Sequence, residues 1–197
     1  MPPKPTPSLR RRELEQVATR LFAERGYHAT SMEDLARALG LRRGSLYTHI
    51  SAKQELLLAT VEQGAEAFER AMSSALAEDG ADPLERLRAA LRAHVGVVAA
   101  HPDAAACFLY EWRHLDERER ARAVELRDAY ELRVRALFVD GVAAGSFRED
   151  LDVAFATLAF LSLGNWSSTW YRAGGPLSPD EVAERFFALL ALGVAAG

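Results

Sequence analysis

The N-terminal quarter of the chain is divided into short helical segments, and this division constrains the fold more than any other feature. Apolar side chains recur at spacings of three and four over residues 10–25, which predicts an amphipathic helix that ends at Gly26. Ser31 precedes an acid at Asp34 in a capping pattern, so a second helix is expected to begin there and to end at Gly40. A third short segment follows the glycine directly. Three short helices with a tight turn between the last two predict a helix-turn-helix.

The third segment is rich in hydrogen-bonding side chains. Leu46 and Ile50 lie on one helical face, and the other faces hold Arg42, Arg43, Ser45, Tyr47, Thr48 and His49. A helix of this kind fits the major groove of DNA, where arginine donates two parallel hydrogen bonds to guanine. We therefore expect the first three of these side chains to reach base edges and the last three to contact phosphates.

Two neighbouring features support the same interpretation. Gly44 would let the DNA backbone approach closely. The capping pattern returns at Ser51 and Gln54, which predicts the start of a fourth helix, and Lys53 adds a charge beside free amides that suit a phosphate. The alternative is an ordinary solvated helical hairpin. The joint pattern of capped helices, glycine turn and polar third segment disfavours that alternative.

Charge is divided unevenly along the chain. Residues 1–60 hold ten Lys and Arg against six Asp and Glu, whereas residues 61–197 hold fourteen against twenty-two. A basic head on an acidic body indicates that the head meets a polyanion such as double-stranded DNA. We expect residues 1–9 to form a disordered, proline-stiffened basic tail. Arg10 to Arg12 would add sequence-independent contacts that weaken with salt.

Several function classes are disfavoured by residue types and motifs that the sequence lacks. The single cysteine, Cys107, excludes an internal disulfide and a cysteine-based zinc site, and it fits a reducing cytoplasm. No histidine pair has the spacing of a zinc peptidase, and no nucleophile motif or phosphate-binding glycine loop occurs. No apolar run reaches the roughly 18 residues that a membrane span needs. We therefore expect a cytoplasmic protein that is not an enzyme, with no metal, no cofactor and no membrane partner.

The rest of the chain continues in helical periods, and strong helix formers dominate it, which predicts an all-α fold. Helices are expected over residues 53–78, 83–100, 103–114, 116–144, 153–173 and 179–194. We expect them to form an antiparallel helical body. On this interpretation, residues 10–52 are a helix-turn-helix DNA-binding domain and residues 53–197 a ligand-binding and dimerisation domain.

Aromatic residues in the body predict a ligand pocket. Phe108, Trp112 and Leu115 would share one helical face, and Trp166 and Trp170 recur in an apolar helix that also carries polar residues. Aromatic stripes at helical spacing also occur in ordinary cores, and that interpretation stays open. The candidate ligand-binding residues are Phe68, Met72, Phe108, Trp112, Arg113, Asn165, Trp166, Thr169, Trp170 and Arg172.

The stretch FAERGYHATSMEDLARALGLRRGSLYTHISAKQELL resembles the N-terminal signature of TetR-type transcriptional repressors, over about residues 10–57. The resemblance implies a homodimer that represses transcription by binding an operator. The residues that it places nearest the bases are Arg43, Gly44, Ser45 and Tyr47. Those that it places at phosphates are Tyr47, His49, Lys53 and, at the start of the second helix, Ser31. The aromatic residue that often follows the histidine in this family is Ile50 here, a difference that affects packing more than contact.

The stretches YEWRHL, GSFREDLD and LGNWSSTWYRAGGPLSPDEVAERF resemble one TetR subgroup over about residues 108–190. Members of that subgroup control the degradation of fatty acids, steroids or aromatic acids in response to acyl-CoA thioesters. The resemblance implies a CoA moiety that needs cations, for which Arg113 and Arg172 are candidates, although both could equally form surface ion pairs. Two alternatives stay open: an efflux repressor that binds cationic drugs, with Glu111 as a contributor, and a helical small-molecule carrier with a basic end.

The last two expected helices carry more apolar surface than a two-helix hairpin can bury, so we expect a dimer about a two-fold axis. Its interface is expected to include Phe155, Leu158, Phe186 and Leu190. Such a dimer would present two third segments to DNA grooves about 34–36 Å apart, which matches a palindromic operator. A small apolar ligand wedged against Phe68 or Met72 would tilt the helix over 53–78, change the spacing of the two heads and release the DNA.

Overall fold

The computed structural model describes residues 9–48, 50–77 and 80–195, and the regular structure of these residues is helical. The first helices are α1 (Leu9–Arg25), α2 (Met32–Ala38), α3 (Arg43–Leu46), α4 (Lys53–Ala75) and α5 (Pro83–Ala100). They are followed by α6 (Pro102–Leu109), the 3₁₀ helix η1 (Glu111–His114), α7 (Glu117–Ala143), α8 (Val153–Trp170) and α9 (Pro179–Val194). The expected all-α class is confirmed. Residues 1–8 of the expected tail lie outside the described residues, and Leu9 already belongs to α1.

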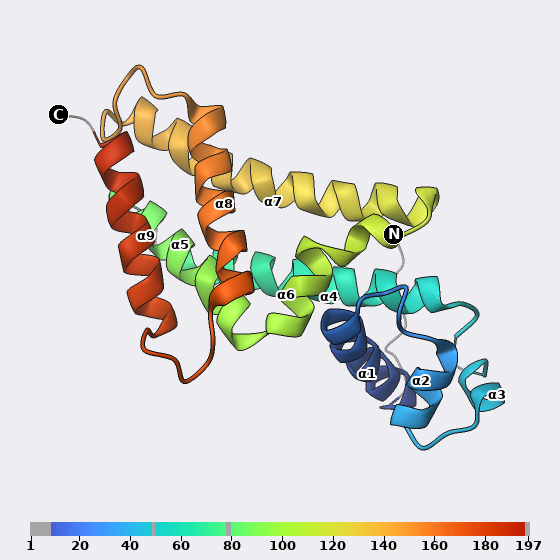
Figure 1. The fold of residues 1–197 in the computed structure, drawn as a ribbon. Helices are drawn as coiled ribbons and strands as arrows, with labels where there is room; N and C mark the ends of the chain where they lie inside the picture. The colour runs from blue at the N-terminus through green and yellow to red at the C-terminus, as the bar shows by residue number, and fades with distance from the viewer. Residues whose placement is uncertain (1–8, 49, 78–79, 196–197) are drawn as a thin grey trace.

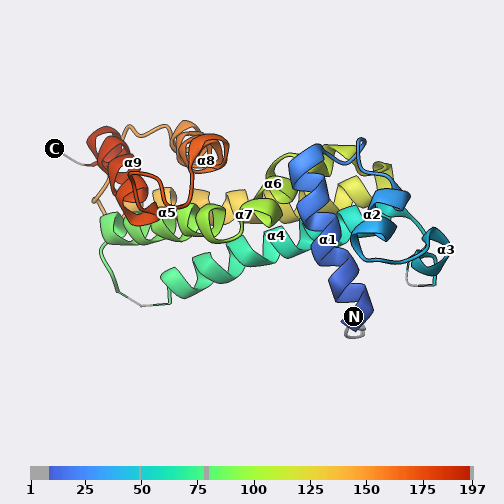
Figure 2. The same cartoon turned by 60° about the horizontal axis from the view of Figure 1, so that its bottom comes forward.

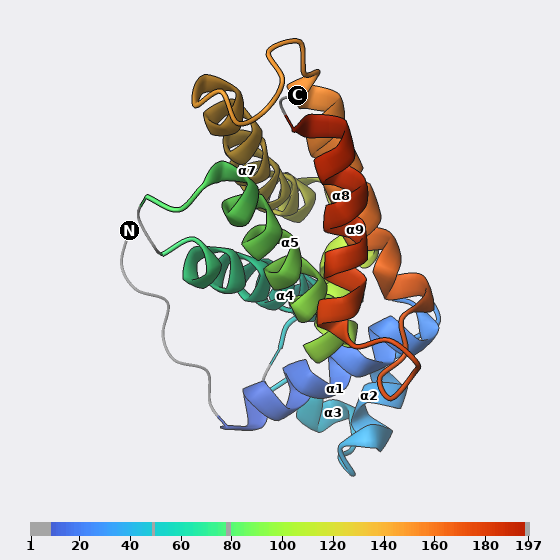
Figure 3. The ribbon, with the colours of Figure 1, turned by 90° about the vertical axis from the view of Figure 1, so that its left-hand side faces the viewer.

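The helices form an elongated molecule with a small head at one end (Figures 1 and 2). Helices α1, α2 and α3 make the head, and α8 and α9 lie together at the opposite end. Helix α4 leads from the head into the body, where it packs against α5, α6 and α7. Helix α5 packs chiefly against α9, and α7 packs against α8. Figure 3 shows the face that α8 and α9 present to the outside.

Local signals begin and end several helices where the sequence predicts. The Ser31 hydroxyl accepts a hydrogen bond from the Asp34 N–H at 3.1 Å, and the Asp34 carboxylate accepts one from the Ser31 N–H at 2.9 Å. This reciprocal pair is the capping box expected at the start of α2, and Ser178 and Glu181 form another at the start of α9. Gly40 has a φ of 64°, a left-handed conformation that costs glycine little, and it follows directly after the end of α2.

The capping box expected at Ser51 is wrong. Ala52 is the N-cap residue of α4 and provides no side-chain cap, while the Ser51 N–H donates to the Glu55 carboxylate at 3.3 Å. Gln54 is the expected partner of Ser51, but its Nε2–H donates to the His114 carbonyl at 2.9 Å. A contact with the body therefore uses the side chain that the local pattern assigned to the cap.

Two helices are shorter than expected. The third segment is expected to be helical to residue 50, but α3 ends at Leu46. After this end, the Thr48 hydroxyl donates to the Ser45 carbonyl at 2.7 Å, a local side-chain bond of the kind that competes with helical hydrogen bonds. The helix expected over 103–114 breaks at Tyr110, whose hydroxyl lies 2.8 Å from that of Ser168 on α8. Phe108, Trp112 and Leu115 consequently do not lie on one helix, and the stripe predicted for them does not form.

Other helix ends differ from the expected bounds by one to three residues, among them the start of α6 at Pro102 and the end of α7 at Ala143. Helix α4 ends at Ala75, and the end expected near residue 78 lies outside the described residues. Helix α8 ends at Trp170 rather than at residue 173, where the chain turns extended. Helix α7 begins at Glu117, with the Asp116 carboxylate accepting a hydrogen bond from the Glu119 N–H at 3.0 Å as its cap.

Across the described ranges, no helix combines the length and the apolar character that a membrane crossing requires. The same ranges contain no group of three or more His, Cys, Asp or Glu side chains placed to hold a metal ion. Cys107 is fully buried, and burial raises the pKa of its thiol to about 12, so the thiolate does not form at neutral pH.

Candidate nucleic-acid interface and ligand pocket

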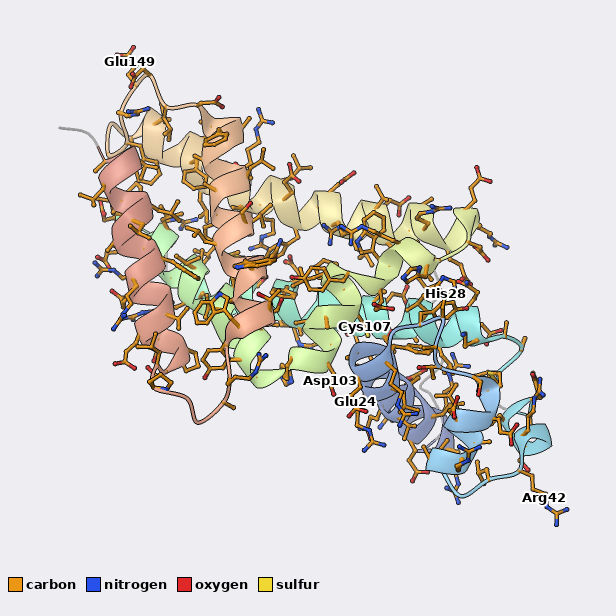
Figure 4. All side chains as sticks on the ribbon, viewed as in Figure 1. Glu24, His28, Arg42, Asp103, Cys107 and Glu149 are labelled. Carbon is orange, nitrogen blue, oxygen red and sulfur yellow. The ribbon has the colours of Figure 1, made fainter. Side chains whose placement is uncertain are left out.

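Helix α3 and the turn after it form the outer surface of the head. Leu46 is fully buried and Ile50 is 3% exposed, so these two side chains anchor the segment to the core. The exposed side chains are Arg42, Arg43, Ser45, Tyr47 and Thr48. Figure 4 shows Arg42 pointing away from the rest of the molecule. No carboxylate of the described residues pairs with either arginine, so both charges face the solvent.

Gly44 lies in the middle of this surface. A Cβ atom at Gly44 would meet nothing within 4 Å, so packing inside the protomer does not require a glycine there. The open space leaves the backbone of α3 accessible to an approaching partner. His49, another predicted DNA contact, lies outside the described residues.

Lys53 points toward the inside of the head. Its ammonium donates to the carbonyls of Tyr27 and Thr30, each at 2.8 Å, and lies 3.9 Å from the centre of the Tyr27 ring. The side chain is half-buried, and burial lowers the pKa of Lys53. Two of its three N–H groups therefore hold the connector between α1 and α2, and one is left for the predicted phosphate contact. The Ser31 hydroxyl is similarly engaged, in the α2 cap.

Helix α1 of the head packs against α4 and α6, and polar contacts at η1 add a second connection between head and body. The Tyr27 N–H donates to Glu111 Oε2 at 2.7 Å, a hydrogen bond that we call the head–body bond. Beside it, Gln54 donates to the His114 carbonyl, and His28 Nε2 lies 3.1 Å from His114 Nδ1. Figure 4 shows His28 at this junction. These contacts tie η1 to the connector between α1 and α2 and to the start of α4.

A partly enclosed cavity of about 140 Å³ lies among α5, α6, α7 and α8. The side chains that line it are His94, Phe108, Leu109, Arg127, Asp128, Tyr130, Glu131, Leu161 and Asn165, of which the carboxylate residues Asp128 and Glu131 are exposed. Phe68 packs behind it, with its ring centre 4.7 Å from that of His94, and Met72 is fully buried in the core. The cavity brings together Phe108 and Asn165, which the sequence analysis proposed, with His94, Arg127 and Tyr130, which it missed.

His94 is the polar centre of this cavity. It is 1% exposed, and its Nδ1 lies 2.9 Å from the Tyr130 hydroxyl. Burial lowers the pKa of His94 to about 4, so the imidazole is neutral at physiological pH. Hydrogen bonding toward the Asn165 side chain opposes this effect more weakly, although the two side chains do not reach full hydrogen-bond geometry. Within the described part of the chain, neither His94 Nε2 nor Asn165 Oδ1 reaches hydrogen-bond geometry with any atom. Buried polar atoms without a protein partner are costly, so a water molecule or a ligand group that reaches both atoms would be stabilised in this cavity.

Gly164 determines how closely α8 approaches the imidazole. A Cβ atom at Gly164 would lie 2.5 Å from His94 Cδ2 and 2.7 Å from His94 Nε2, closer than non-bonded atoms approach. Glycine is therefore required for the His94 ring to lie against the backbone of α8, directly beside Asn165.

Arg127 is a cation held among aromatic rings. Its guanidinium lies 4.9 Å from the ring centre of Trp112 and 5.6 Å from that of Phe108, and it donates to the Phe108 carbonyl at 3.1 Å. Burial, followed by repulsion from Arg113, lowers the pKa of Arg127, and no carboxylate in the described ranges forms an ion pair with it. The Trp112 Nε1–H is buried without an acceptor among the described residues. Two arginines beside an unpaired indole N–H favour the binding of an anionic group.

The two predicted tryptophans of α8 lie on the outer side of that helix. Trp166 is 65% exposed and Trp170 is 41% exposed. They border an open groove of about 550 Å³ that is lined by Tyr110, Ser162, Leu163, Asn165, Trp166, Trp170 and Phe186. Phe186 meets the Trp170 ring edge-on at 6.2 Å between centres. Asn165 is the residue that the groove shares with the cavity.

Three polar candidates lie on exposed surface. Arg113 is exposed, donates to the Tyr110 carbonyl at 3.3 Å and lies 5.3 Å from the Trp112 ring centre, near Arg127. Thr169 and Arg172 are exposed at the end of α8, where Arg172 donates to the Thr169 carbonyl at 3.3 Å. The structure therefore places Arg113 beside the pocket aromatics and leaves Thr169 and Arg172 away from the cavity.

The outer face of α8 and α9 is unusually apolar. Phe155 is 68% exposed and Leu158 is 52% exposed. On α9 the exposed leucines are Leu189 at 62% and Leu192 at 88%, whereas Leu190 is 7% exposed and belongs to the core of the protomer. A step of one residue on a helix rotates the side chain by about 100°, so Leu189 faces outward while Leu190, proposed for the dimer interface, faces the core of the protomer.

This fold and these sites define a class: two-domain helical regulators in which a DNA-reading head is coupled to a ligand-binding body. Residues 16–60 match the family model of bacterial regulatory proteins of the tetR family. Residues 80–194 match the tetracyclin repressor-like C-terminal domain. The chain belongs to the TetR family of transcriptional regulators, and it is a TetR-type repressor rather than an enzyme.

Among its relatives is the HTH-type transcriptional repressor KstR2 of Mycobacterium tuberculosis, which is 32% identical over 190 residues that cover 94% of this chain and 92% of the relative. The structure of that ketosteroid transcriptional regulator matches with a TM-score of 0.87 at 26% identity, over 98% of both chains. PfmR, a TetR family regulator of Thermus thermophilus, matches with a TM-score of 0.81 at 37% identity, over 91% of this chain and 96% of PfmR. AibR, in complex with isovaleryl coenzyme A and operator DNA, matches with a TM-score of 0.82 at 28% identity, over 93% of this chain and 97% of AibR.

Proposed function

We propose that this repressor binds a palindromic operator as a homodimer and releases it when a small apolar ligand with an anionic tail, such as an acyl-CoA thioester, enters the cavity around His94. It would act in the cytoplasm, with residues 10–52 as the DNA-binding domain and residues 53–197 as the ligand-binding and dimerisation domain. The observation that carries the ligand assignment is Arg127, a half-buried guanidinium beside the cavity without an ion-pair partner in the described ranges.

The DNA contacts of the proposal rest on the exposed surface of α3. Arg42 and Arg43 face solvent without ion-pair partners among the described residues, and Gly44 leaves the backbone between them and Ser45 open. Arginines in this position suit guanine edges and phosphates equally well. The remaining proposed contacts are Ser31, Tyr47, Thr48, His49 and Lys53, for which one N–H of the Lys53 ammonium is left.

The ligand assignment rests on the division of chemistry around the cavity. Phe108 and Leu109 supply apolar lining for an acyl group, while Arg127, Arg113 and the Trp112 N–H supply donors for an anionic part. AibR, which shares the fold, is known in complex with isovaleryl coenzyme A and operator DNA, and this supports the same ligand class here. The cationic-drug alternative cannot use Glu111, whose carboxylate is engaged in the head–body bond, but Asp128 and Glu131 line the cavity and keep a cationic ligand as the competing class.

The dimer assignment rests on the apolar face of α8 and α9. We expect Leu158→Glu to convert the dimer to a monomer in size-exclusion chromatography with light scattering, since it would bury a carboxylate in an apolar interface. The matched control is Leu132→Glu on α7, a leucine that is 63% exposed on a different helix. A Leu158→Glu protein that remains dimeric would place the interface elsewhere.

The release mechanism uses two contacts of the cavity wall. Phe68 on α4 lies against the rings of His94, Phe108 and Tyr130, so a ligand that moves these rings acts on the helix that carries the head. The η1 turn carries Trp112, whose ring lies 4.9 Å from the guanidinium of the cavity residue Arg127, and Glu111 in the head–body bond. A ligand releases DNA only if it binds the released arrangement more tightly than the bound one.

The direct test uses a duplex selected by the purified protein from random DNA, labelled and followed by fluorescence anisotropy. Isovaleryl-CoA and longer acyl thioesters should release the protein from this duplex, whereas CoA alone and the free acids should not. We expect Arg127→Gln to raise the required thioester concentration by about tenfold or more, and Arg135→Gln, an exposed arginine two turns along α7, to leave it unchanged. If no thioester releases the DNA and cationic dyes do, the ligand assignment is wrong.

A further inference from the structure

The tautomer of His94 determines which group the cavity can bind. Among the described residues, the hydrogen bond of the buried Tyr130 hydroxyl is to His94 Nδ1. If the hydroxyl oxygen accepted from Nδ1–H, the hydroxyl proton would be buried without an acceptor. Tyr130 therefore donates to Nδ1, and the neutral ring carries its proton on Nε2. The unsatisfied Nε2 is then a donor, and it faces a cavity whose other unsatisfied atom, Asn165 Oδ1, is an acceptor.

We propose that this cavity binds a ring-sized, uncharged part of the ligand that carries a hydroxyl group. The hydroxyl oxygen accepts from His94 Nε2–H, and the hydroxyl proton is donated to Asn165 Oδ1, so one group satisfies both buried atoms. A ketone at the same place satisfies His94 alone, and a methylene satisfies neither. The inference deepens the proposed function and rests on it, since it assigns the head of the ligand whose anionic tail meets Arg127.

The size and charge of the site limit the group further. A volume of about 140 Å³ is close to the roughly 150 Å³ of an engineered protein cavity that accepts one benzene ring. A carboxylate here would lie against the Asn165 oxygen and near the exposed carboxylates of Asp128 and Glu131, which also line the cavity. An ammonium beside His94 would face the Nε2–H. Both charges would also lose their hydration on entering. The group is therefore neutral, about the size of a six-membered ring, and hydroxylated.

The experiment compares three thioesters that differ at one ring carbon. Cyclohexanecarbonyl-CoA, its 4-oxo derivative and its 4-hydroxy derivative are titrated into the full-length protein by calorimetry and tested for release of the selected duplex. We expect the hydroxy compound to bind about tenfold or more tightly than the unsubstituted ring, with the oxo compound between them. Equal affinities overturn the proposal, and so does tightest binding of the oxo compound, which would mean that the Asn165 amide presents its NH₂ group instead.

The matched variant is Asn165→Leu, which removes the acceptor and keeps a side chain of similar size. The ratio of its affinity for the hydroxy thioester to that for the unsubstituted thioester should fall to about the ratio of oxo to unsubstituted in the wild type. The unsubstituted ring thus serves as the internal control for general damage to the pocket. A variant that keeps the full hydroxyl preference contradicts the role of Asn165.

A second measurement does not depend on CoA or on a variant. In protein labelled with ¹⁵N-histidine, the wild-type His94 signals should show the Nε2–H tautomer, and cyclohexanol should shift Nε2 more than methylcyclohexane does. Failure of every thioester to bind, together with a cyclohexanol shift, would reject the CoA assignment and keep the hydroxyl site. An Nδ1–H tautomer or equal shifts with both probes would reject the hydroxyl site itself.

Discussion

Acidification should destabilise the folded protein through His94. In the unfolded chain a histidine has a pKa of about 6.5, whereas burial lowers the folded-state pKa of His94 to about 4. Between these two values the unfolded state binds a proton that the folded state excludes, so stability falls as pH decreases from 6.5 to 4 and is unaffected by this group above 6.5. With 1.36 kcal/mol for each pKa unit, the loss amounts to about 2 kcal/mol at pH 5 and about 3 kcal/mol at pH 4.

The assay is urea unfolding of the wild type and of His94→Gln, measured at several pH values from 7.5 to 5. The glutamine variant is less stable at pH 7 because it disturbs a packed site, but its stability should change by about 2 kcal/mol less than that of the wild type on going to pH 5. Subtracting the free energy of unfolding of the variant from that of the wild type at each pH cancels the contributions of the titratable groups that both proteins contain. Hydrogen bonds to the cap residues lower the pKa of Asp34 and of Glu181. The protein therefore loses the stability that these carboxylates contribute chiefly below the measured pH range. Parallel pH curves for the two proteins would refute the buried neutral imidazole.

Three further results are expected. Arg43→Ala should weaken operator binding. If Arg43 contacts a phosphate, the slope of log affinity against log salt concentration should fall by about one. An unchanged slope with relaxed base preference would instead indicate that Arg43 contacts a base. Gly164→Ala should lower the free energy of unfolding by about 1–3 kcal/mol, because its Cβ would overlap the His94 ring, whereas Gly193→Ala, where a Cβ meets open space within α9, should be neutral or stabilising in the same thermal melts. Glu111→Gln should weaken the head–body bond by removing its charge and change the operator affinity of the ligand-free protein, measured by anisotropy; unchanged affinity with and without ligand would exclude η1 from the coupling.

The helical layout was predictable because its signals are local. Periodicity together with proline and glycine positions gives the bounds of α5 and α9 directly, and the Ser31 capping box is present as the sequence predicts. The break at Tyr110 was not predictable, because it depends on a hydroxyl contact with Ser168, fifty-eight residues away along the chain. Gln54 fails as a cap for the same reason, since its partner lies on η1.

The candidate site was predictable only where a polar residue interrupts an apolar helix. That criterion selected Asn165, and applied to α5 it would also have selected His94, which stands among valines and alanines. Arg127 carries no such signal, because it belongs to a helix with many charges, most of which are exposed. Leu190 shows the converse limit: apolar composition identifies a helix with two apolar faces, but it does not say which leucine faces inward.

The placement of Trp112 and Glu111 in one four-residue turn gives the protein a built-in optical reporter. The indole of Trp112 lies against Arg127, which lines the cavity, while the neighbouring carboxylate binds the head. Once the exposed Trp166 and Trp170 are replaced by phenylalanine, the emission of the remaining indole would report a change around Arg127 with no dye attached.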